Sequence, residues 1–190
     1  VYLSTELGFI AIIAAAYGVT TVLRWRSEEI QGHSELVLAT ATSRTRYAVG
    51  HLLVALLGTA LLEFALGLGT VLADSSGGGA LGGASRVLPA ALIRLPAVWV
   101  CVGVAVAALG WLPRWTAPIG WGALAFSLIV GEFGGVFGLP GWLLDLAPFT
   151  HVPRMPVEAF ALTPTLALVA VAAALCTVGV VGFRRRDIGG

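Results

Sequence analysis

Long apolar runs dominate this chain, and polar, glycine-rich or proline-rich stretches separate them. A helix rises about 1.5 Å per residue, so about 20 apolar residues cross a hydrocarbon core of about 30 Å. Helices also satisfy their own backbone hydrogen bonds inside lipid, which favours them over open strands. The runs predict five membrane-spanning helices, at about residues 3–23, 47–73, 87–111, 116–139 and 163–183.

The only long polar segment, residues 24–46, lies between the first two predicted spans. Its charged residues are Arg24, Arg26, Arg44 and Arg46 at the two ends and Glu28, Glu29 and Glu35 between them. If the apolar runs lie in a membrane, this segment is the part through which a protein outside the bilayer can move the spans.

The polar segment has the features of a short capped helix. Ser27 is expected to be its N-cap, and the two glutamates that follow would then lie in the first turn, where the helix dipole favours acids. Glu28, Gly32 and Glu35 share one helical face. Ser43 is expected to cap the second span. Two readings stay open: a docking helix for a cytosolic motor, or an ordinary juxtamembrane loop with capped ends.

Composition excludes an ordinary soluble domain. The chain is 58% hydrophobic and 11% charged, with a mean hydropathy of +0.94, whereas soluble domains are about 25% charged. All 11 basic residues are arginine, so no lysine is present to complete an ATP-binding P-loop. The glycines at 77–83 are therefore read as a flexible loop between spans. The chain begins at Val1, almost directly in apolar sequence, and is expected to be part of a longer protein.

The distribution of arginines predicts the orientation, because cytoplasmic loops are enriched in them. Eight lie on one side, namely Arg24, Arg26, Arg44, Arg46, Arg114, Arg184, Arg185 and Arg186, against Arg86, Arg154 and the intramembrane Arg94 on the other. The C-terminus is therefore expected to be cytoplasmic and Val1 to lie outside.

Residues 140–160 are apolar, but prolines at 140, 148, 153 and 156 divide them into pieces too short to span. They are expected to form a short helix or re-entrant hairpin in the outer interface. A tight inward turn is predicted at residues 112–115, where Pro113 ends a helix and Arg114 anchors it.

Three ionisable residues fall within predicted spans: Glu63, Arg94 and Glu132. Charged groups are costly in lipid and normally face the bundle interior or pair with one another. The three could form a polar patch in a substrate path, but a Glu63–Arg94 pair that holds helices together is favoured. Glu132 lies among glycines at 131, 134, 135 and 138, which predict close helix packing there.

Motifs for other chemistry are missing from the sequence. Cys101 and Cys176 are expected to be packing residues, and the three histidines have no metal-ligand spacing. No metal site is predicted. No catalytic motif and no basic, aromatic-rich patch for nucleic acid occurs.

Several stretches together resemble one family of transporters. RSEEIQGHSELVLATATSRTRYAVGH (residues 26–51) resembles the first cytoplasmic loop of type-2 ATP-binding-cassette exporter permeases, closest to the polyketide-antibiotic and tetronasin exporter branch. The matching positions are Glu28, Glu29, Gly32, Glu35, Ser43 and Arg44. LGWLPRW (109–115), LDLAPFTHVPRMP (144–156) and GFRRRDIG (182–189) are similar to three further stretches of that branch.

The resemblance implies an all-α bacterial plasma-membrane protein with six helices per unit, a cytoplasmic coupling helix and a broken outward segment. The five visible helices would then be the C-terminal unit of a longer permease that lacks its first span here. It implies a separate cytosolic ATPase that binds ATP and Mg, a second transmembrane unit, and no cofactor in this chain. Export of hydrophobic drugs or polyketide antibiotics is expected; alternatives are a same-fold lipid or polymer exporter, an intramembrane enzyme, or an assembly subunit.

Overall fold

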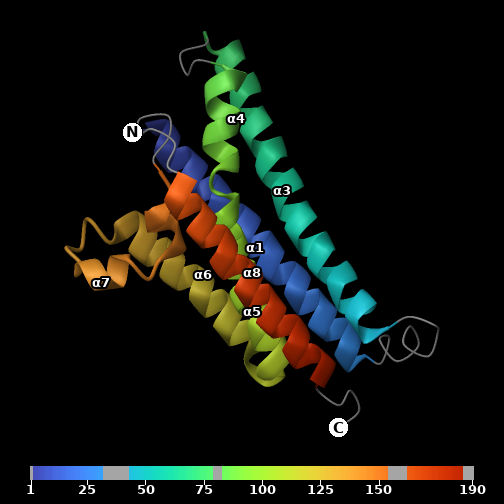
Figure 1. Cartoon of the computed structure of the whole chain (residues 1–190). Coiled ribbons are helices and arrows are strands. Elements are labelled where there is room, and N and C mark those ends of the chain that lie inside the picture. The colour runs from blue at the N-terminus through green and yellow to red at the C-terminus, as the bar shows by residue number, and fades with distance from the viewer. Residues whose placement is uncertain (1, 32–42, 79–82, 154–161, 186–190) are drawn as a thin grey trace.

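The computed structural model describes residues 2–31, 43–78, 83–153 and 162–185, without the side chains of residues 2–5 and of Glu132. In these ranges every regular element is a helix, as predicted (Figure 1). They are α1 (Tyr2–Ile30), α3 (Arg44–Ser76), α4 (Ala84–Leu92), α5 (Leu95–Trp111), η1 (Pro113–Trp115), α6 (Thr116–Phe133), α7 (Gly141–Leu144), η2 (Pro148–His151) and α8 (Leu162–Arg185).

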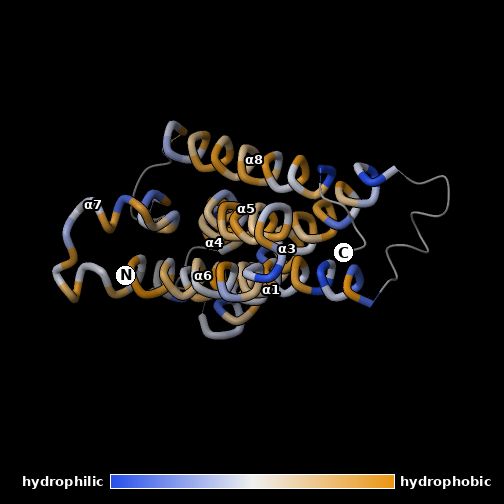
Figure 2. The backbone as a smooth tube through the Cα atoms, turned by 90° about the horizontal axis from the view of Figure 1, so that it is seen from below, coloured by the Kyte–Doolittle hydropathy of each residue, from blue (hydrophilic) through white to orange (hydrophobic). Residues whose placement is uncertain are grey.

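Four helical stretches in the described part of the chain are long and apolar enough to cross a membrane. They are Glu6–Ile30, Arg44–Ser76, Ala84–Trp111 and Leu162–Arg185, and they correspond to four of the five predicted spans. Helix α6 is shorter, with 18 residues, and packs against α1 and α5. Hydrophilic residues gather at the end of the bundle near the C-terminus (Figure 2).

Helix α5 is the centre of the bundle and packs against α1, α3, α6 and α8. Its buried side chains recur on all sides of the helix, as expected for an apolar helix enclosed by others. Helix α1 instead buries one face, formed by residues spaced three or four apart. These residues are Leu7, Ala11, Ala14, Gly18, Val22 and Trp25.

Helices α5 and α8 approach each other through glycines. A Cβ atom on Gly110 would collide with the backbone of Gly179, and one on Gly179 would collide with the carbonyl of Val106. A Cβ on Gly182 would lie 2.6 Å from Nε1 of Trp111, and that indole donates a hydrogen bond of 3.0 Å to the carbonyl of Val178. Small residues of this kind allow close helix packing in membranes.

The third predicted span is present as the apolar stretch Ala84–Trp111, and a turn at Ile93 and Arg94 divides it into α4 and α5; Pro96 has no N–H to donate to the carbonyl one turn earlier, which favours a break. Two other predictions are wrong. Ser27 is not an N-cap, because α1 continues through it to Ile30. Helix α6 ends at Phe133 instead of continuing to residue 139.

The early end of α6 also removes most of the predicted glycine packing around Glu132. Gly135 and Gly138 lie past the helix, and a Cβ on either would meet nothing within 4 Å. Gly131 and Gly134 do approach other segments, since a Cβ on them would meet Phe149 and Leu144. These partners belong to the broken segment and not to another long helix.

The broken character of residues 140–160 is confirmed where the structure describes it. Residues 140–153 contain only α7 and η2, each four residues long. Thr150 stabilises the turn between them, because its hydroxyl donates to the carbonyls of Leu144 and Ala147 at 2.7 and 2.6 Å. The predicted tight turn at 112–115 is also present, as η1.

The glycine contact between α5 and α8 predicts a specific sensitivity to added volume. Gly179→Ala should lower the thermal midpoint of the full-length protein in detergent, because overpacking costs about 1–3 kcal/mol. Gly69→Ala in α3 is the matched control, since a Cβ there meets nothing within 4 Å. Equal midpoints for the two variants would contradict this account of the packing.

Candidate functional site

Three helix ends meet where the polar segment leaves the bundle. Helix α1 ends there, α3 begins there, and α8 finishes beside them (Figure 1). We call this region the coupling end. The turn η1 with Arg114 lies at the same end (Figure 1). The arginine pattern of the sequence assigns a group of arginines to the cytoplasmic side. The structure brings together the helix ends that carry those of them that it describes.

Four rings from three helices form an aromatic cluster at the coupling end: Trp25, Tyr47, His51 and Phe183. Trp25 stacks on His51, with ring centroids 5.3 Å apart and planes 10° from parallel. Phe183 lies 5.1 Å from Trp25 and Tyr47 lies 4.5 Å from His51, centroid to centroid. Tyr47 and His51 are one helical turn apart, so α3 presents both to the same neighbours.

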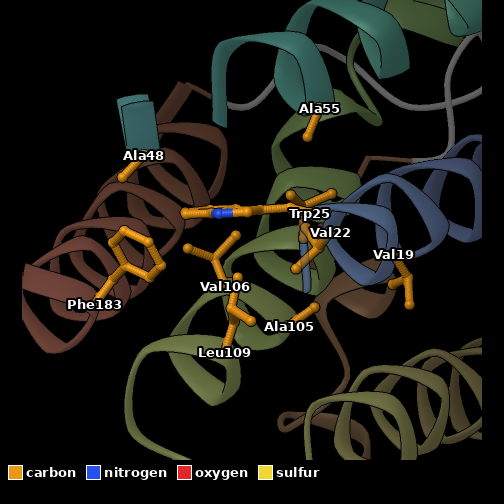
Figure 3. Close-up of a cluster of buried hydrophobic side chains, with 10 residues drawn as sticks. Val19, Val22, Trp25, Ala48, Ala55, Ala105, Val106, Leu109 and Phe183 are labelled. Carbon is orange, nitrogen blue, oxygen red and sulfur yellow. The ribbon is translucent and has the colours of Figure 1, made fainter. Parts of the chain in front are cut away.

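Trp25 is the anchor of this cluster, with a side chain only 1% exposed. It belongs to a buried apolar group to which α1, α3, α5 and α8 all contribute (Figure 3). Ala48 of α3 and Val106 of α5 are members of the same group. The aromatic cluster therefore ties both flanks of residues 32–42 to the central helix and to α8.

The predicted coupling residues lie around this cluster where the structure describes them. Glu28 Oε2 is 3.5 Å from His51 Nε2, which links the last turn of α1 to α3. Both side chains are partly exposed, so the pair contributes at most about 1 kcal/mol. Glu29 is its neighbour in the same turn.

The predicted cap at Ser43 is confirmed. Its hydroxyl accepts a hydrogen bond of 3.2 Å from the backbone N–H of Arg46, and Arg44 is the first residue of α3. Gly32 and Glu35 lie outside the described residues, so their part in a docking helix stays a prediction. The same holds for the side chain of Glu132.

The intramembrane residues Glu63 and Arg94 both lie inside the bundle. Glu63 is 0% exposed and Arg94 is 6% exposed, and their charges are close enough to interact. The Arg94 guanidinium donates to the carbonyl of Ala90. Neither carboxylate oxygen of Glu63 has a hydrogen-bond partner among the described residues. The proposed pair is therefore not joined by a hydrogen bond.

The remaining candidate chemistry is consistent with packing roles. Cys101 and Cys176 are buried free thiols, as predicted, and Cys101 Sγ lies 3.7 Å from Ser127 Oγ. Within the described ranges no three metal-ligating side chains gather.

Sequence reasoning missed the aromatic cluster. The available signal was the position of its members. Trp25 lies at the start of the polar segment, Tyr47 and His51 follow its end, and Phe183 precedes the terminal arginines. Aromatic residues at span ends are usually read as interface anchors. Here Trp25 and Phe183 point into the bundle instead, with exposures of 1% and 0%.

The fold and these helix ends define an all-α, multi-pass membrane protein. A family model described as "Multidrug efflux system permease Rv1217c, C-terminal domain" matches residues 1–184. The multidrug efflux system permease protein Rv1217c of Mycobacterium tuberculosis is 38% identical over 188 residues, which cover 98% of this chain. The chain belongs to this family of efflux permease domains. It spans 34% of that relative's length.

The aromatic cluster predicts that Trp25→Ala loosens the coupling end. Loss of a buried tryptophan typically costs about 3–5 kcal/mol, so the thermal midpoint of the full-length protein should fall clearly. Trp115→Ala is the control at the same end, because Trp115 is 61% exposed. Thermal denaturation in detergent separates them, and a larger loss in the Trp115 variant would refute the role given to Trp25.

Proposed function

We propose that this chain is the C-terminal transmembrane unit of a bacterial plasma-membrane permease that exports hydrophobic drugs, driven by a separate ATP-binding-cassette ATPase. The printed name of the Mycobacterium tuberculosis relative, a multidrug efflux system permease, supports the cargo class. The resemblance of residues 26–51 to the coupling loop of type-2 exporters supports the energy source. Polyketide antibiotics are the cargo that this resemblance favours.

One observation carries the proposal: both flanks of residues 32–42 are packed onto the aromatic cluster together with the end of α8. A force on the polar segment therefore acts on α1, α3 and α8 together and not on a slack loop. Coupling between two sites requires an element whose arrangement both sites bias. The coupling end is a suitable element, because its rings connect the two helix ends that flank residues 32–42 to the buried centre of the bundle.

The charges at the coupling end suit a cytosolic partner. Glu28, Glu29 and Glu35 are the acids offered to basic groups of the ATPase, while Arg24 and Arg26 lie near lipid headgroups. By the positive-inside rule the coupling end and the C-terminus are cytoplasmic. The chain has no P-loop lysine, so ATP and Mg are bound by the partner. If the whole permease is as long as the Mycobacterium tuberculosis relative, the two thirds of it that lie outside this chain would supply the second transmembrane unit.

The test is a full-length permease with Glu28, Glu29 and Glu35 all changed to alanine, reconstituted with its ATPase. We expect drug export to be lost while the protein level stays near wild type and the thermal midpoint falls only slightly, because the triple change removes the partly exposed Glu28–His51 contact as well as the acids proposed to bind the partner. Asp74→Ala together with Asp145→Ala is the control, since both lie away from the coupling end. Normal drug export by the triple variant would sink the coupling role.

A further inference from the structure

Glu63 is an acid without a hydrogen bond in the interior of the bundle. Its side chain is 0% exposed, and neither carboxylate oxygen accepts a hydrogen bond from the described residues. It lies 13 residues before the end of α3, on the half away from the coupling end. Burying such a group without a partner costs several kcal/mol. A structural role alone would be served better by an apolar residue.

The neighbours of Glu63 along α3 show what it faces. One turn earlier, Thr59 accepts a hydrogen bond of 3.2 Å from Nε1 of Trp99 in α5. One turn later, Gly67 faces α4, where a Cβ would lie 3.0 Å from the Cβ of Ala91. Because α3 runs past both helices, Glu63 falls between these contacts, opposite the turn at Ile93 and Arg94.

The polar groups around Glu63 are committed elsewhere. The Thr59 hydroxyl donates to the carbonyl of Leu56 at 2.8 Å, so it does not serve the carboxylate. The Arg94 guanidinium donates to the carbonyl of Ala90 and acts on Glu63 as a nearby positive charge. The carboxylate thus has no hydrogen-bond partner among the described residues, and a cation entering from outside this unit can pair with it.

We propose that Glu63, with the ring of Trp99, binds the positively charged nitrogen of lipophilic organic cations. A carboxylate accepts hydrogen bonds and offers a full negative charge, and an indole face attracts organic ammonium groups. Arg94 is the resident counter-charge that the cargo replaces. The break between α4 and α5 is the place where movement uncovers the carboxylate. This inference rests on the proposed export function and adds the chemical class of its cargo.

The test compares two cargo probes of matched shape, 10-methylacridinium, which is a cation, and 10-methylacridone, which is neutral. Inside-out vesicles containing the full-length permease and its ATPase are assayed for ATP-driven uptake of each. Glu63→Gln should reduce uptake of the cation at least about ten-fold, since a buried charge partner is lost, and leave the neutral probe within two-fold. Glu63→Asp should restore most of the cation uptake, and Glu6→Gln is the control acid in α1.

The outcomes separate this inference from the function on which it rests. The cation site is overturned if wild type and Glu63→Gln take up the cation equally, or if the variant loses uptake of both probes. In either case the export function shown by wild type stands. The cation site is also overturned if wild type takes up the neutral probe but not the cation. If wild type takes up neither probe with ATP, the export function itself fails. Selective loss of the cation, with rescue by aspartate, supports the site.

Discussion

The close contact between α5 and α8 is the constraint on which the rest of the bundle depends. Gly110, Gly179 and Gly182 let the two backbones approach to a distance that no side chain would allow. Because helices in lipid gain little from apolar burial alone, such packing is a main source of their association. The contact seats Phe183, one residue beyond Gly182, against Trp25. The order of the coupling end thus depends on glycines in the last turns of α5 and α8.

The bundle treats its two polar regions in different ways. At the coupling end, the stacked rings are supported by a partly exposed Glu28–His51 pair and an N-cap at Ser43, although the buried Nε1 of Trp25 has no hydrogen-bond partner among the described residues. In the interior, Glu63 is fully buried and its carboxylate has no hydrogen-bond partner in the described part of the chain. The first arrangement favours a rigid element that transmits force. The second keeps an energetic cost in the bundle, which the proposed cation would relieve on binding.

Much of the fold follows from the sequence because a bilayer restricts it so strongly. Apolar runs predicted the helices, and the pattern of arginines predicted which helix ends meet. One error lies at a helix end: α1 continues through Ser27, because the solvent-exposed end of a long helix extends at little cost beyond its apolar run. The turn before Pro96, inside the third span, was not predicted. The aromatic cluster required knowing which face of each helix is buried, which an almost uniformly apolar span does not reveal.

The central claim is that an ATPase binds at residues 32–42 and that the coupling end transmits this binding to the bundle. The most direct measurement is co-purification of the full-length permease with its candidate ATPase, with these residues native or scrambled and with Trp25, Tyr47 and His51 unchanged in both. The account predicts that scrambling abolishes capture and drug-stimulated ATP hydrolysis while the thermal midpoint of the permease stays the same. Equal capture by both forms would contradict it.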